Sequence, residues 1–436
     1  MNFLRALYHL LLAELAAAWY GHPSRRMTVV GVTGTNGKST TVELIVKILE
    51  ESGFKVASVS SVRFKIGDKE WPNTLKMTMP GRGALQKFLR DAKREHATHA
   101  VLEATSEGIH QSRHRAIAWD ALVLTNVTPE HIESHGSFEK YRRAKEKLFK
   151  LLSKTYRKNE IPKVMVVNAD DASRDRFLRY DADKKITYSA KEYEVAFEDG
   201  GMRILTPAGM EIRSKLTGAF NLANIAAATA LARALNIGWD AIKRGIEKAD
   251  VVAGRMEYIQ HEPFAVIVDY AHTPDALHKV YEALQKSLRG SSSEILRGRT
   301  SLICVLGAAG GGRDKWKRPE FGKIASEFCS EVILTNEDPY DENPEAILND
   351  IEAGLPAVAF FDPPKPCAKE VAKAGTKALK ILDRGTAIER AIHDAKAGDV
   401  VIITGKGCEP WIMGPKGSKT AWDDREVARK ALVEKQ

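Results

Sequence analysis

The sequence predicts an α/β protein with two sheet-containing domains. Its 436 residues exceed what one ordinary hydrophobic core holds together. Short runs of β-branched residues alternate with helical stretches, which is typical of a mostly parallel sheet covered by helices. The composition, with 44% hydrophobic and 28% charged residues, is that of a globular protein.

Two α/β series follow one another along the chain. The first has strand-like segments at residues 28–32, 55–60, 100–102 and 121–125, a helix at 41–52, and an alanine-rich helix at 221–235. The second has strand-like segments at residues 265–268, 302–306, 331–334 and 400–404, with a loop at 290–294. The join between the two series is expected between Lys248 and Glu262.

The N-terminal segment is apolar, but charges at Arg5 and Glu14 interrupt it. A signal peptide needs a cleaner apolar stretch, and a spanning helix needs about 20 apolar residues. Leu4, Leu11 and Leu15 recur at near-helical intervals. We therefore expect an amphipathic helix packed on the domain that follows, with membrane association as the minor alternative.

The net charge of +9 suits clefts that bind anionic small molecules. Basic residues are scattered, and the densest basic run, residues 142–147, has acidic neighbours, so nucleic-acid binding is not expected. The cysteines lie far apart without CxxC spacing. This indicates neither a zinc site nor a disulfide framework and favours a reducing cytoplasm. They are Cys304, Cys329, Cys367 and Cys408.

A glycine loop between a strand and a helix gives the strongest local signal. Gly34 and Gly37 let the backbone N–H groups turn toward phosphate oxygens, Lys38 reaches the β- and γ-phosphates, and the Ser39 hydroxyl ligates Mg²⁺. Val32 stands where the strict motif has its first glycine, and the alternative is a glycine turn without a ligand. The residues expected to bind ATP here are Gly34, Thr35, Asn36, Gly37, Lys38, Ser39 and Thr40.

The spelling of this loop resembles the ATP loop of the Mur ligases, which add amino acids to the peptidoglycan precursor. The resemblance continues in order and spacing through to the C-terminus, and it is most similar to the MurE branch, the UDP-N-acetylmuramoyl-peptide ligases. The further matching segments are Glu103-Ala-Thr-Ser-Glu-Gly-Ile-His-Gln-Ser-Arg113, Thr125-Asn-Val-Thr-Pro-Glu-His-Ile-Glu-Ser-His-Gly136, Tyr141-Arg-Arg-Ala-Lys-Glu-Lys-Leu-Phe149, Gly218-Ala-Phe-Asn-Leu-Ala-Asn224, Gly254-Arg-Met-Glu257, Asp269-Tyr-Ala-His-Thr-Pro-Asp-Ala-Leu277, Gly310-Gly-Gly-Arg-Asp-Lys-Trp-Lys-Arg-Pro319, Gly405-Lys-Gly-Cys-Glu409 and Asp423-Asp-Arg-Glu426.

The resemblance implies an ATP-dependent ligase that joins an amino acid to a carboxylate through an acyl-phosphate. It implies small-molecule substrates, Mg²⁺, a monomeric enzyme and a cytoplasmic location, with neither nucleic acid nor membrane as a partner. The implied organisation is an N-terminal helix (1–24), a central P-loop ATPase domain (25–256) and a C-terminal Rossmann-like domain that binds the amino acid (257–436).

Four residues carry the catalysis in this interpretation: Lys38, Glu103, His131 and Lys145. Ser39 and Glu103 hold Mg²⁺, His131 contacts a second metal ion, and Lys145 carries a carbamate that turns a cation into a metal-binding carboxylate. Taken alone, each of the last three residue types is more often an ordinary polar surface group.

The resemblance also assigns residues to the substrates. Arg313 pairs with the α-carboxylate of the amino acid and Glu409 with a distal ammonium group. For Asp269 and His272, local helix capping is the alternative. The residues implied for ATP are Asn221, Asn224, Arg255, Asp269 and His272; for the acceptor, Thr78, Thr105, Gln111 and Arg113; for the amino acid, Arg313, Glu337, Asp338, Pro339, Tyr340, Gly405 and Glu409.

Three features depart from the family pattern. Only 33 residues precede Gly34, where family members carry a uridine-binding domain, so UDP is held differently, a partner supplies that domain, or the acceptor is another carboxylate such as a poly-amino-acid chain. Met79 replaces a second acceptor-binding threonine. Tyr340 stands where the diaminopimelate-selecting stretch has an arginine, which favours lysine or another single-carboxylate amino acid unless Lys317 or Arg318 substitutes.

Overall fold

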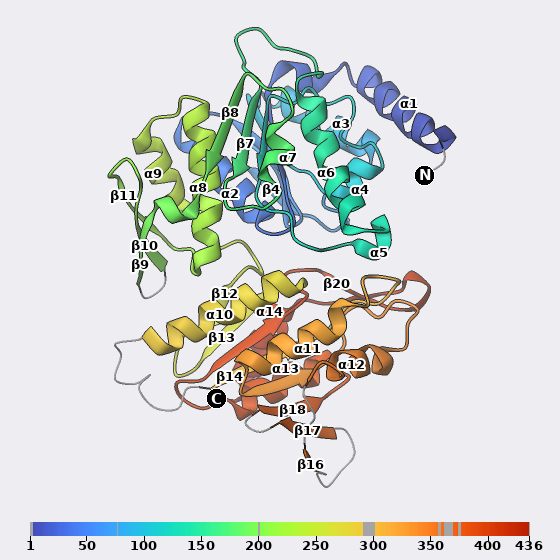
Figure 1. Ribbon diagram of the computed structural model, residues 1–436, viewed down its shortest axis with the longest axis vertical. Coiled ribbons are helices and arrows are strands. Elements are labelled where there is room, and N and C mark those ends of the chain that lie inside the picture. The colour runs from blue at the N-terminus through green and yellow to red at the C-terminus, as the bar shows by residue number, and fades with distance from the viewer. Residues whose placement is uncertain are drawn as a thin grey trace. The chain divides into compact units, whose positions relative to one another are not determined.

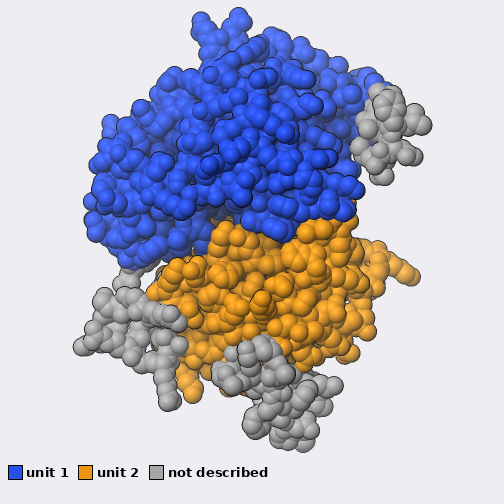
Figure 2. Space-filling view, in the orientation of Figure 1, with its two compact units in different colours: residues 1–130, 135–250 blue, residues 131–134, 251–436 orange. Residues whose placement is uncertain are grey.

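Two separate eight-stranded sheets organise the chain. The computed structural model describes residues 3–75, 77–198, 201–290, 301–355, 359–361, 369–373 and 376–435. The chain divides into two units: unit 1 holds residues 1–130 and 135–250, and unit 2 holds residues 131–134 and 251–436 (Figure 2). The α/β fold class predicted from the sequence is confirmed, while the predicted domain limits stay predictions.

The sheet of unit 1 has the strand order β4-β3-β2-β5-β1-β6-β7-β8. Strands β2, β5, β1, β6, β7 and β8 run parallel, and β3 and β4 add an antiparallel edge. Most of the central strands are buried along their whole length, which explains their unbroken apolar runs. The strands are β1 (Thr28–Thr33), β2 (Val56–Val59), β3 (Arg63–Ile66), β4 (Lys69–Pro72), β5 (His99–Glu103), β6 (Ala121–Leu124), β7 (Val164–Asn168) and β8 (Lys184–Tyr188).

Helices cover both faces of this sheet (Figure 1). One face carries α2 (Lys38–Glu51), α8 (Ala219–Ala234) and α9 (Trp239–Lys248). The other carries α3 (Arg82–Arg94), α4 (Ser106–His110), α6 (Phe138–Leu152) and α7 (Arg174–Leu178). The remaining elements are α5 (Ile132–His135), η2 (Ala190–Glu192) and a small antiparallel sheet of β9 (Glu194–Glu198), β10 (Gly201–Leu205) and β11 (Glu211–Ser214).

The N-terminal helix α1 (Phe3–Trp19) is present and packs beside α3, joined to β1 by the short helix η1 (Pro23–Arg26) (Figure 1). Its buried face is made by Ala13 and Ala17. Leu11 and Leu15, whose spacing predicted the helix, are exposed, because the smaller alanines allow the closer approach to the domain. The side chain of Leu4 lies outside the described residues. In the part of the chain that the structure describes, no helix is long and apolar enough to cross a membrane.

The sheet of unit 2 has the order β12-β13-β19-β14-β15-β18-β17-β16, with β13, β19, β14, β15 and β18 parallel. Helices α10, α11 and α12 pack in a row, and α13 and α14 form a second packed pair (Figure 1). The elements are β12 (Glu257–Gln260), β13 (Ala265–Asp269), α10 (Pro274–Gly290), β14 (Leu302–Leu306), α11 (Lys317–Phe328), β15 (Glu331–Leu334), α12 (Pro344–Glu352), β16 (Ala359–Phe361), β17 (Lys369–Lys373), β18 (Thr376–Lys380), α13 (Arg384–Asp394), β19 (Val400–Thr404), β20 (Trp411–Met413), η4 (Pro415–Gly417), β21 (Lys419–Ala421) and α14 (Asp424–Lys435). Of the predicted loop 290–294, Gly290 ends α10 and residues 291–294 lie outside the described residues.

One cysteine expectation is wrong. Cys304 on β14 and Cys329 at the end of α11 form a disulfide, with their Cα atoms 6.1 Å apart. The two are separated by 25 positions in the sequence, and only the return of α11 to the sheet brings them together. Cys408 is a free thiol, and Cys367 lies outside the described residues.

A buried histidine predicts how unit 1 responds to acid. His114 is buried, and within the described residues neither of its ring nitrogens has a hydrogen-bond partner. Burial first, and then the charges of Arg115 and Lys147, lower the pKa of His114 to about 3. A histidine in the unfolded chain has a pKa near 6.5. The free energy of unfolding is therefore expected to fall as pH drops below about 6.5, by about 2 kcal/mol at pH 5.

The variant His114→Phe is expected to flatten the slope of the free energy of unfolding against pH. The apolar ring has a similar shape, needs no hydrogen bond and does not titrate. Urea unfolding at pH 7.5, 6.5 and 5.0 measures it. Part of the slope is expected to persist, because burial also lowers the pKa of His99 to about 4. An unchanged slope in the variant would exclude His114 as the source.

Candidate active site

The glycine loop between β1 and α2 is shaped by close neighbours. Gly34 has φ 154°, and a Cβ placed on it lies 1.9 Å from Thr125 Oγ1. Gly37 has φ 80°, and a Cβ there lies 2.2 Å from Asn224 Oδ1. No larger residue fits at either position without moving these partners, so both predicted glycines are required by the geometry.

The loop is held in place from the neighbouring strand ends. Thr125 Oγ1 donates to the Asn36 carbonyl at 2.7 Å, and the Asn36 amide donates to Asn126 Oδ1 at 2.9 Å. Thr35 Oγ1 donates to the Thr128 carbonyl at 3.2 Å. These bonds fix the loop before any phosphate arrives, so little ordering is needed on binding.

Lys38 begins α2, and its Nζ donates to the Thr35 carbonyl at 2.7 Å, across the loop. The ammonium group thus lies beside the helix N-terminus, where backbone N–H groups and the helix dipole favour an anion. Thr40 is buried in the first turn of the same helix. This is the arrangement that the sequence predicted for phosphate binding.

Ser39 and Glu103 lie together at the ends of neighbouring elements. Glu103 ends β5 directly opposite Val32 of β1, and Ser39 Oγ donates to its Oε2 at 2.9 Å. The Ser61 amide also donates to that oxygen at 2.9 Å. Hydroxyl and carboxylate oxygens are hard ligands that fit Mg²⁺ with several waters retained. Within the described residues no group of three or more His, Cys, Asp or Glu side chains forms a metal cluster.

Lys145 is the most unusual group in unit 1. It lies on α6, is almost fully buried, and its Nζ donates to the Gly34 carbonyl at 2.7 Å. The same nitrogen sits 4.6 Å from the centre of the Tyr141 ring. Burial, and next the charge of Lys38, hold the pKa of Lys145 well below its usual range, although Glu130 and Glu103 oppose this. Burial therefore disfavours the charged form of this amine.

The structure brings Lys38, Ser39, Glu103 and Lys145 together in unit 1. His131 has φ 52° and belongs to the segment 131–134, which groups with unit 2. Its assignment as a metal ligand stays a prediction.

The two asparagines assigned to ATP lie on α8 against the glycine loop. Asn224 Oδ1 accepts from Thr41 Oγ1 at 3.3 Å, and its Nδ2 donates to Asn221 Oδ1 at 2.9 Å. Asn221 in turn donates to the Thr217 carbonyl at 2.7 Å. Asn224 therefore backs the loop at Gly37, and an adenine contact stays a prediction.

Three of the acceptor residues gather around α4. Thr105 caps this helix by accepting from the Gly108 amide at 3.1 Å. Arg113 donates to Gln111 Oε1 at 2.7 Å and to the Met79 carbonyl. Thr78 is half-buried beside Met79, whose own side chain is buried in the unit 1 core. The methionine thus packs inward and offers no hydrogen bond to a substrate.

In unit 2, Asp269 ends β13 and is buried. Its two oxygens accept from the Met256 and Ala271 amides, each at 2.7 Å, and burial raises the pKa of its carboxyl group. His272 Nδ1 lies 2.9 Å from the Tyr270 carbonyl. Both side chains thus engage backbone groups outside α10, and their ATP roles stay predictions.

Glu409 is part of an ionic chain. Lys406 Nζ is buried and donates to Glu409 Oε2 and Asp338 Oδ1, each at 2.8 Å. Tyr270 donates its hydroxyl to Glu409 Oε1 at 3.0 Å. Both carboxylate oxygens of Glu409 therefore already accept hydrogen bonds. Lys406 offsets the negative charge of Glu409, which was expected from the sequence to pair with an ammonium group of the substrate.

Tyr340 and Arg313, both assigned to the amino-acid substrate from the sequence, lie beside each other. Arg313 donates to the Tyr340 hydroxyl at 3.2 Å, and Tyr340 takes φ 52°. Gly405 has φ 108°, and a Cβ on it lies 2.4 Å from Glu337 Oε2. Burial, and next the charge of Asp338, raise the pKa of Glu337. The backbone carbonyl of Pro339 lies 2.3 Å from where a Cβ on Gly310 would stand.

Arg318 and Lys317 are already paired. Arg318 is buried and donates to Glu342 and Asp350, each at 2.9 Å. Lys317 lies 3.3 Å from Asp314 Oδ2. These pairs weaken the alternative that either cation replaces the missing arginine at position 340.

Family comparisons identify the chain. Residues 32–232 match the Mur ligase middle domain, and residues 254–407 match the Mur ligase glutamate ligase domain. The chain is 39% identical to a UDP-N-acetylmuramyl-tripeptide synthetase of Roseiflexus sp., over 97% of this chain and 82% of that protein. The chain belongs to the Mur ligase family.

Other proteins to which this Mur ligase is similar support the same family assignment. It is 35% identical to a UDP-N-acetylmuramoyl-L-alanyl-D-glutamate–2,6-diaminopimelate ligase of Bacillus velezensis, over 97% of this chain and 82% of that one. A solved ligase of the same description has 30% identity and a TM-score of 0.58, covering 94% of this chain and 78% of that one. Mycobacterium tuberculosis folylpolyglutamate synthase, at 15% identity and a TM-score of 0.68, covers 98% of both chains and shows the shared fold.

As a Mur ligase, the chain is an ATP-dependent enzyme that forms carbon–nitrogen bonds. Such reactions generally use Mg²⁺ with ATP. Sequence reasoning missed several residues of the site: Ser61, Asn126, Tyr141, Tyr270 and Lys406. Four of them stand inside matched motifs, which was the available signal. Ser61 contacts Glu103 because it follows β2, which pairs with β5. No local sequence pattern predicts this contact.

Proposed function

We propose that this Mur ligase adds an amino acid to the peptide carboxylate of a UDP-N-acetylmuramoyl-peptide during peptidoglycan precursor synthesis. The convergence of Lys38, Ser39, Glu103 and Lys145 on the glycine loop carries the proposal. The names of the two relatives, a tripeptide synthetase and a diaminopimelate ligase, supply the substrate class. A poly-amino-acid acceptor, the predicted alternative, is not favoured by these relatives.

The proposed chemistry has two steps. The acceptor carboxylate attacks the γ-phosphate, which gives ADP and an acyl-phosphate; the amine then attacks the acyl carbon, phosphate leaves, and a proton is released. The loop amides at residues 34–37 and the Lys38 ammonium offset the negative charge of the phosphates. Ser39 and Glu103 would hold Mg²⁺, which would supply further positive charge there. His131 and Arg255 keep their predicted metal and phosphate roles.

We further propose that Lys145 is carbamylated. A neutral amine attacks CO₂ and releases one proton, which leaves a carbamate anion on the side chain. The lowered pKa of Lys145, caused first by burial, supports this, because it raises the fraction of the amine that is neutral. The carbamate would then add a third oxygen ligand beside Glu103.

Phosphate release from ATP tests the reaction. The assay adds UDP-N-acetylmuramoyl-dipeptide, lysine or meso-diaminopimelate, singly and together, and mass spectrometry identifies the product. We expect release only with acceptor and amino acid together. Release that depends on neither substrate would refute the ligase reaction, and release with polyglutamate in place of the UDP-linked acceptor would favour the other carboxylate.

Tyr340 is proposed to disfavour meso-diaminopimelate, since it presents no cation to the second carboxylate. The variant Tyr340→Arg is expected to raise kcat/KM for meso-diaminopimelate relative to lysine by at least about tenfold, because a charge-assisted hydrogen bond is worth about 1.5–3 kcal/mol. Tyr340→Phe is the matched control, since it also loses the bond to Arg313 but adds no charge. Equal preference in both variants would remove position 340 from amino-acid selection.

The cytoplasmic location and monomeric state expected from the sequence belong to the same proposal. Size-exclusion chromatography with light scattering measures the oligomeric state, and a mass of 48.2 kDa is expected for the monomer.

A further inference from the structure

Helix α1 carries an exposed apolar stripe. Its members recur every three or four positions, which places them on one face of the helix. Their exposed fractions are 58% for Tyr8, 53% for Leu11, 65% for Leu15 and 85% for Trp19. The opposite face is buried through Ala13 and Ala17. The stripe is therefore not needed for packing α1 on the domain.

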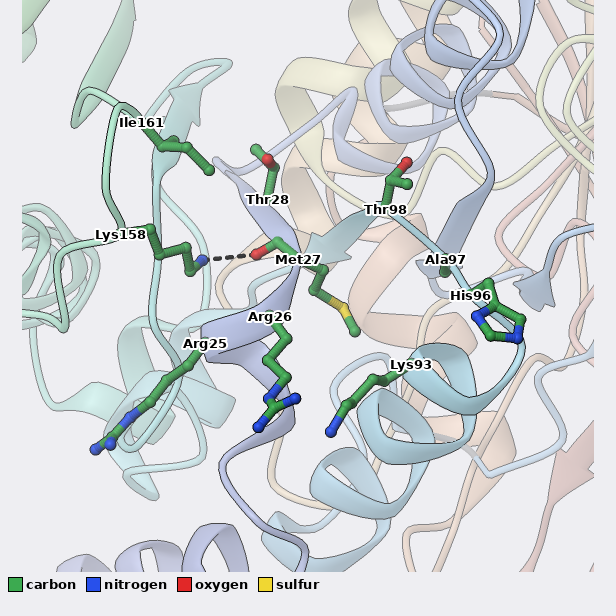
Figure 3. Close-up of a pocket in the computed structure, with 10 residues that line it drawn as sticks. All are labelled: Arg25, Arg26, Met27, Thr28, Lys93, His96, Ala97, Thr98, Lys158 and Ile161. Carbon is green, nitrogen blue, oxygen red and sulfur yellow. Dashed lines mark hydrogen bonds between the residues drawn. The ribbon is translucent and has the colours of Figure 1, made fainter.

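A basic pocket follows directly along the chain. Its cavity of about 690 Å³ is lined by Arg25, Arg26, Lys93, His96 and Lys158 among others. The side chains of Arg25, Arg26 and Lys93 point to the same side (Figure 3). No carboxylate of the described residues lies within ion-pair distance of these three cations, although the Arg25 guanidinium lies over the Tyr156 ring, 4.6 Å from its centre.

Lys158 is the exception among the cations of this basic pocket. Its Nζ donates to the Met27 carbonyl at 2.7 Å, to the Ala118 carbonyl at 2.8 Å, and to Asp120 (Figure 3 shows the first of these bonds). It is therefore neutralised within unit 1. The cations that remain for a ligand are those on η1 and at the end of α3.

The basic pocket is separate from the catalytic machinery of unit 1. It opens at the amino ends of the strands, beside Thr28 of β1 and Thr98 before β5. The glycine loop follows the carboxyl end of β1, and Glu103 ends β5. The two sites thus lie at opposite ends of the strands of the same sheet.

We propose, in place of the expectation that no membrane is a partner, that the apolar stripe and the basic pocket together bind the surface of an anionic membrane. Trp19 and Arg25 are six positions apart in the sequence, so the end of the stripe and the first of these cations lie within about 20 Å of each other. A helix with an apolar face bounded by tyrosine and tryptophan, next to cations that have no carboxylate partner among the described residues, suits a position flat in the headgroup region. The cations would pair with lipid phosphates, and the apolar stripe would lie at the boundary between the headgroups and the acyl chains.

The charge favours a membrane over a second copy of the chain. A second copy would bring the same cations toward one another, whereas anionic lipids neutralise them. The helix lies on the surface and does not cross it, in keeping with its length and its charges. This binding is independent of the proposed reaction.

Vesicle co-sedimentation of the full chain tests the proposal. We expect binding to vesicles of phosphatidylcholine with phosphatidylglycerol, and at least about tenfold weaker binding to phosphatidylcholine alone. Added salt is expected to weaken it. The double variants Leu11→Ser/Leu15→Ser and Arg25→Ala/Arg26→Ala are each expected to weaken binding by at least tenfold.

Lys243→Ala/Arg244→Ala is the matched control, because it removes two exposed cations from α9 and is expected to bind as the unchanged protein does. Thermal melting by circular dichroism verifies that each variant folds. Trp19→Phe is expected to abolish the blue shift of tryptophan emission on binding. Absence of binding to anionic vesicles, or equal binding by the leucine variant, overturns the proposal. A dimer that the leucine variant converts to monomer overturns it in favour of a second copy.

Discussion

Replacing Lys38 with alanine is expected to lower kcat for ligation by about 10³-fold while leaving the fold intact. The Lys38 ammonium donates only to the Thr35 carbonyl among the bonds described, so its loss removes little packing. What disappears is the positive charge at the phosphates, which matters most when negative charge moves during transfer. Steady-state release of ADP with saturating substrates measures kcat, and thermal melting measures the fold.

Lys47→Ala is the control for Lys38→Ala. Lys47 lies on the same helix and pairs only with Glu50, so kcat is expected to stay unchanged. A Lys38→Ala enzyme that keeps kcat within threefold of the original would remove the glycine loop from the mechanism. Because the Lys38 charge helps to lower the pKa of Lys145, the two positions are also expected to be non-additive in a double variant.

The phosphate loop was predictable because its signals are contiguous. A β-branched strand, two glycines and a lysine at a helix start follow one another in the sequence, and the structure repeats that order. Glu103 was predictable for a related reason: it ends a strand, and parallel strand ends meet at one edge. The fold class followed from the same alternation of strands and helices.

Contacts set by tertiary packing were not predictable. Asn224 fixes the need for glycine at position 37, yet it comes from a helix far along the chain. The hydrogen bond from Tyr270 to Glu409 forms because β19 pairs with β13, which brings two segments far apart in the sequence together. Single-sequence patterns carry no information about such partners.

Helix α1 shows a further limit of periodicity. The spacing of its leucines predicted the helix correctly, but both its faces carry apolar residues. Ala13 and Ala17 face the domain because small side chains let two helices approach closely, and the larger leucines are left outside. Periodicity gives the faces of a helix; shape decides which of them is buried.

Replacing Lys145 is expected to have an effect nearly as large as that of Lys38→Ala. Lys145→Met keeps the volume in the buried site but can form no carbamate, and we expect kcat to fall by about 10²–10³-fold. Lys145→Glu brings a permanent carboxylate to the same place and is expected to recover part of the loss. A carbonyl signal from ¹³C-bicarbonate, present in the unchanged protein and absent from both variants, would report the carbamate directly.

The dependence on CO₂ separates a carbamate from a purely structural lysine. Because the folded pKa of Lys145 lies below its usual value, the amine is neutral above that pKa and becomes protonated as pH falls through it. Carbamate formation needs the neutral amine, so CO₂-stripped enzyme is expected to lose activity, most strongly toward acid, and to regain it with bicarbonate. Lys145→Glu is expected to be indifferent to bicarbonate at every pH. If the unchanged protein shares that indifference, Lys145 serves only through its bond to the Gly34 carbonyl, and Lys145→Glu should then be no better than Lys145→Met.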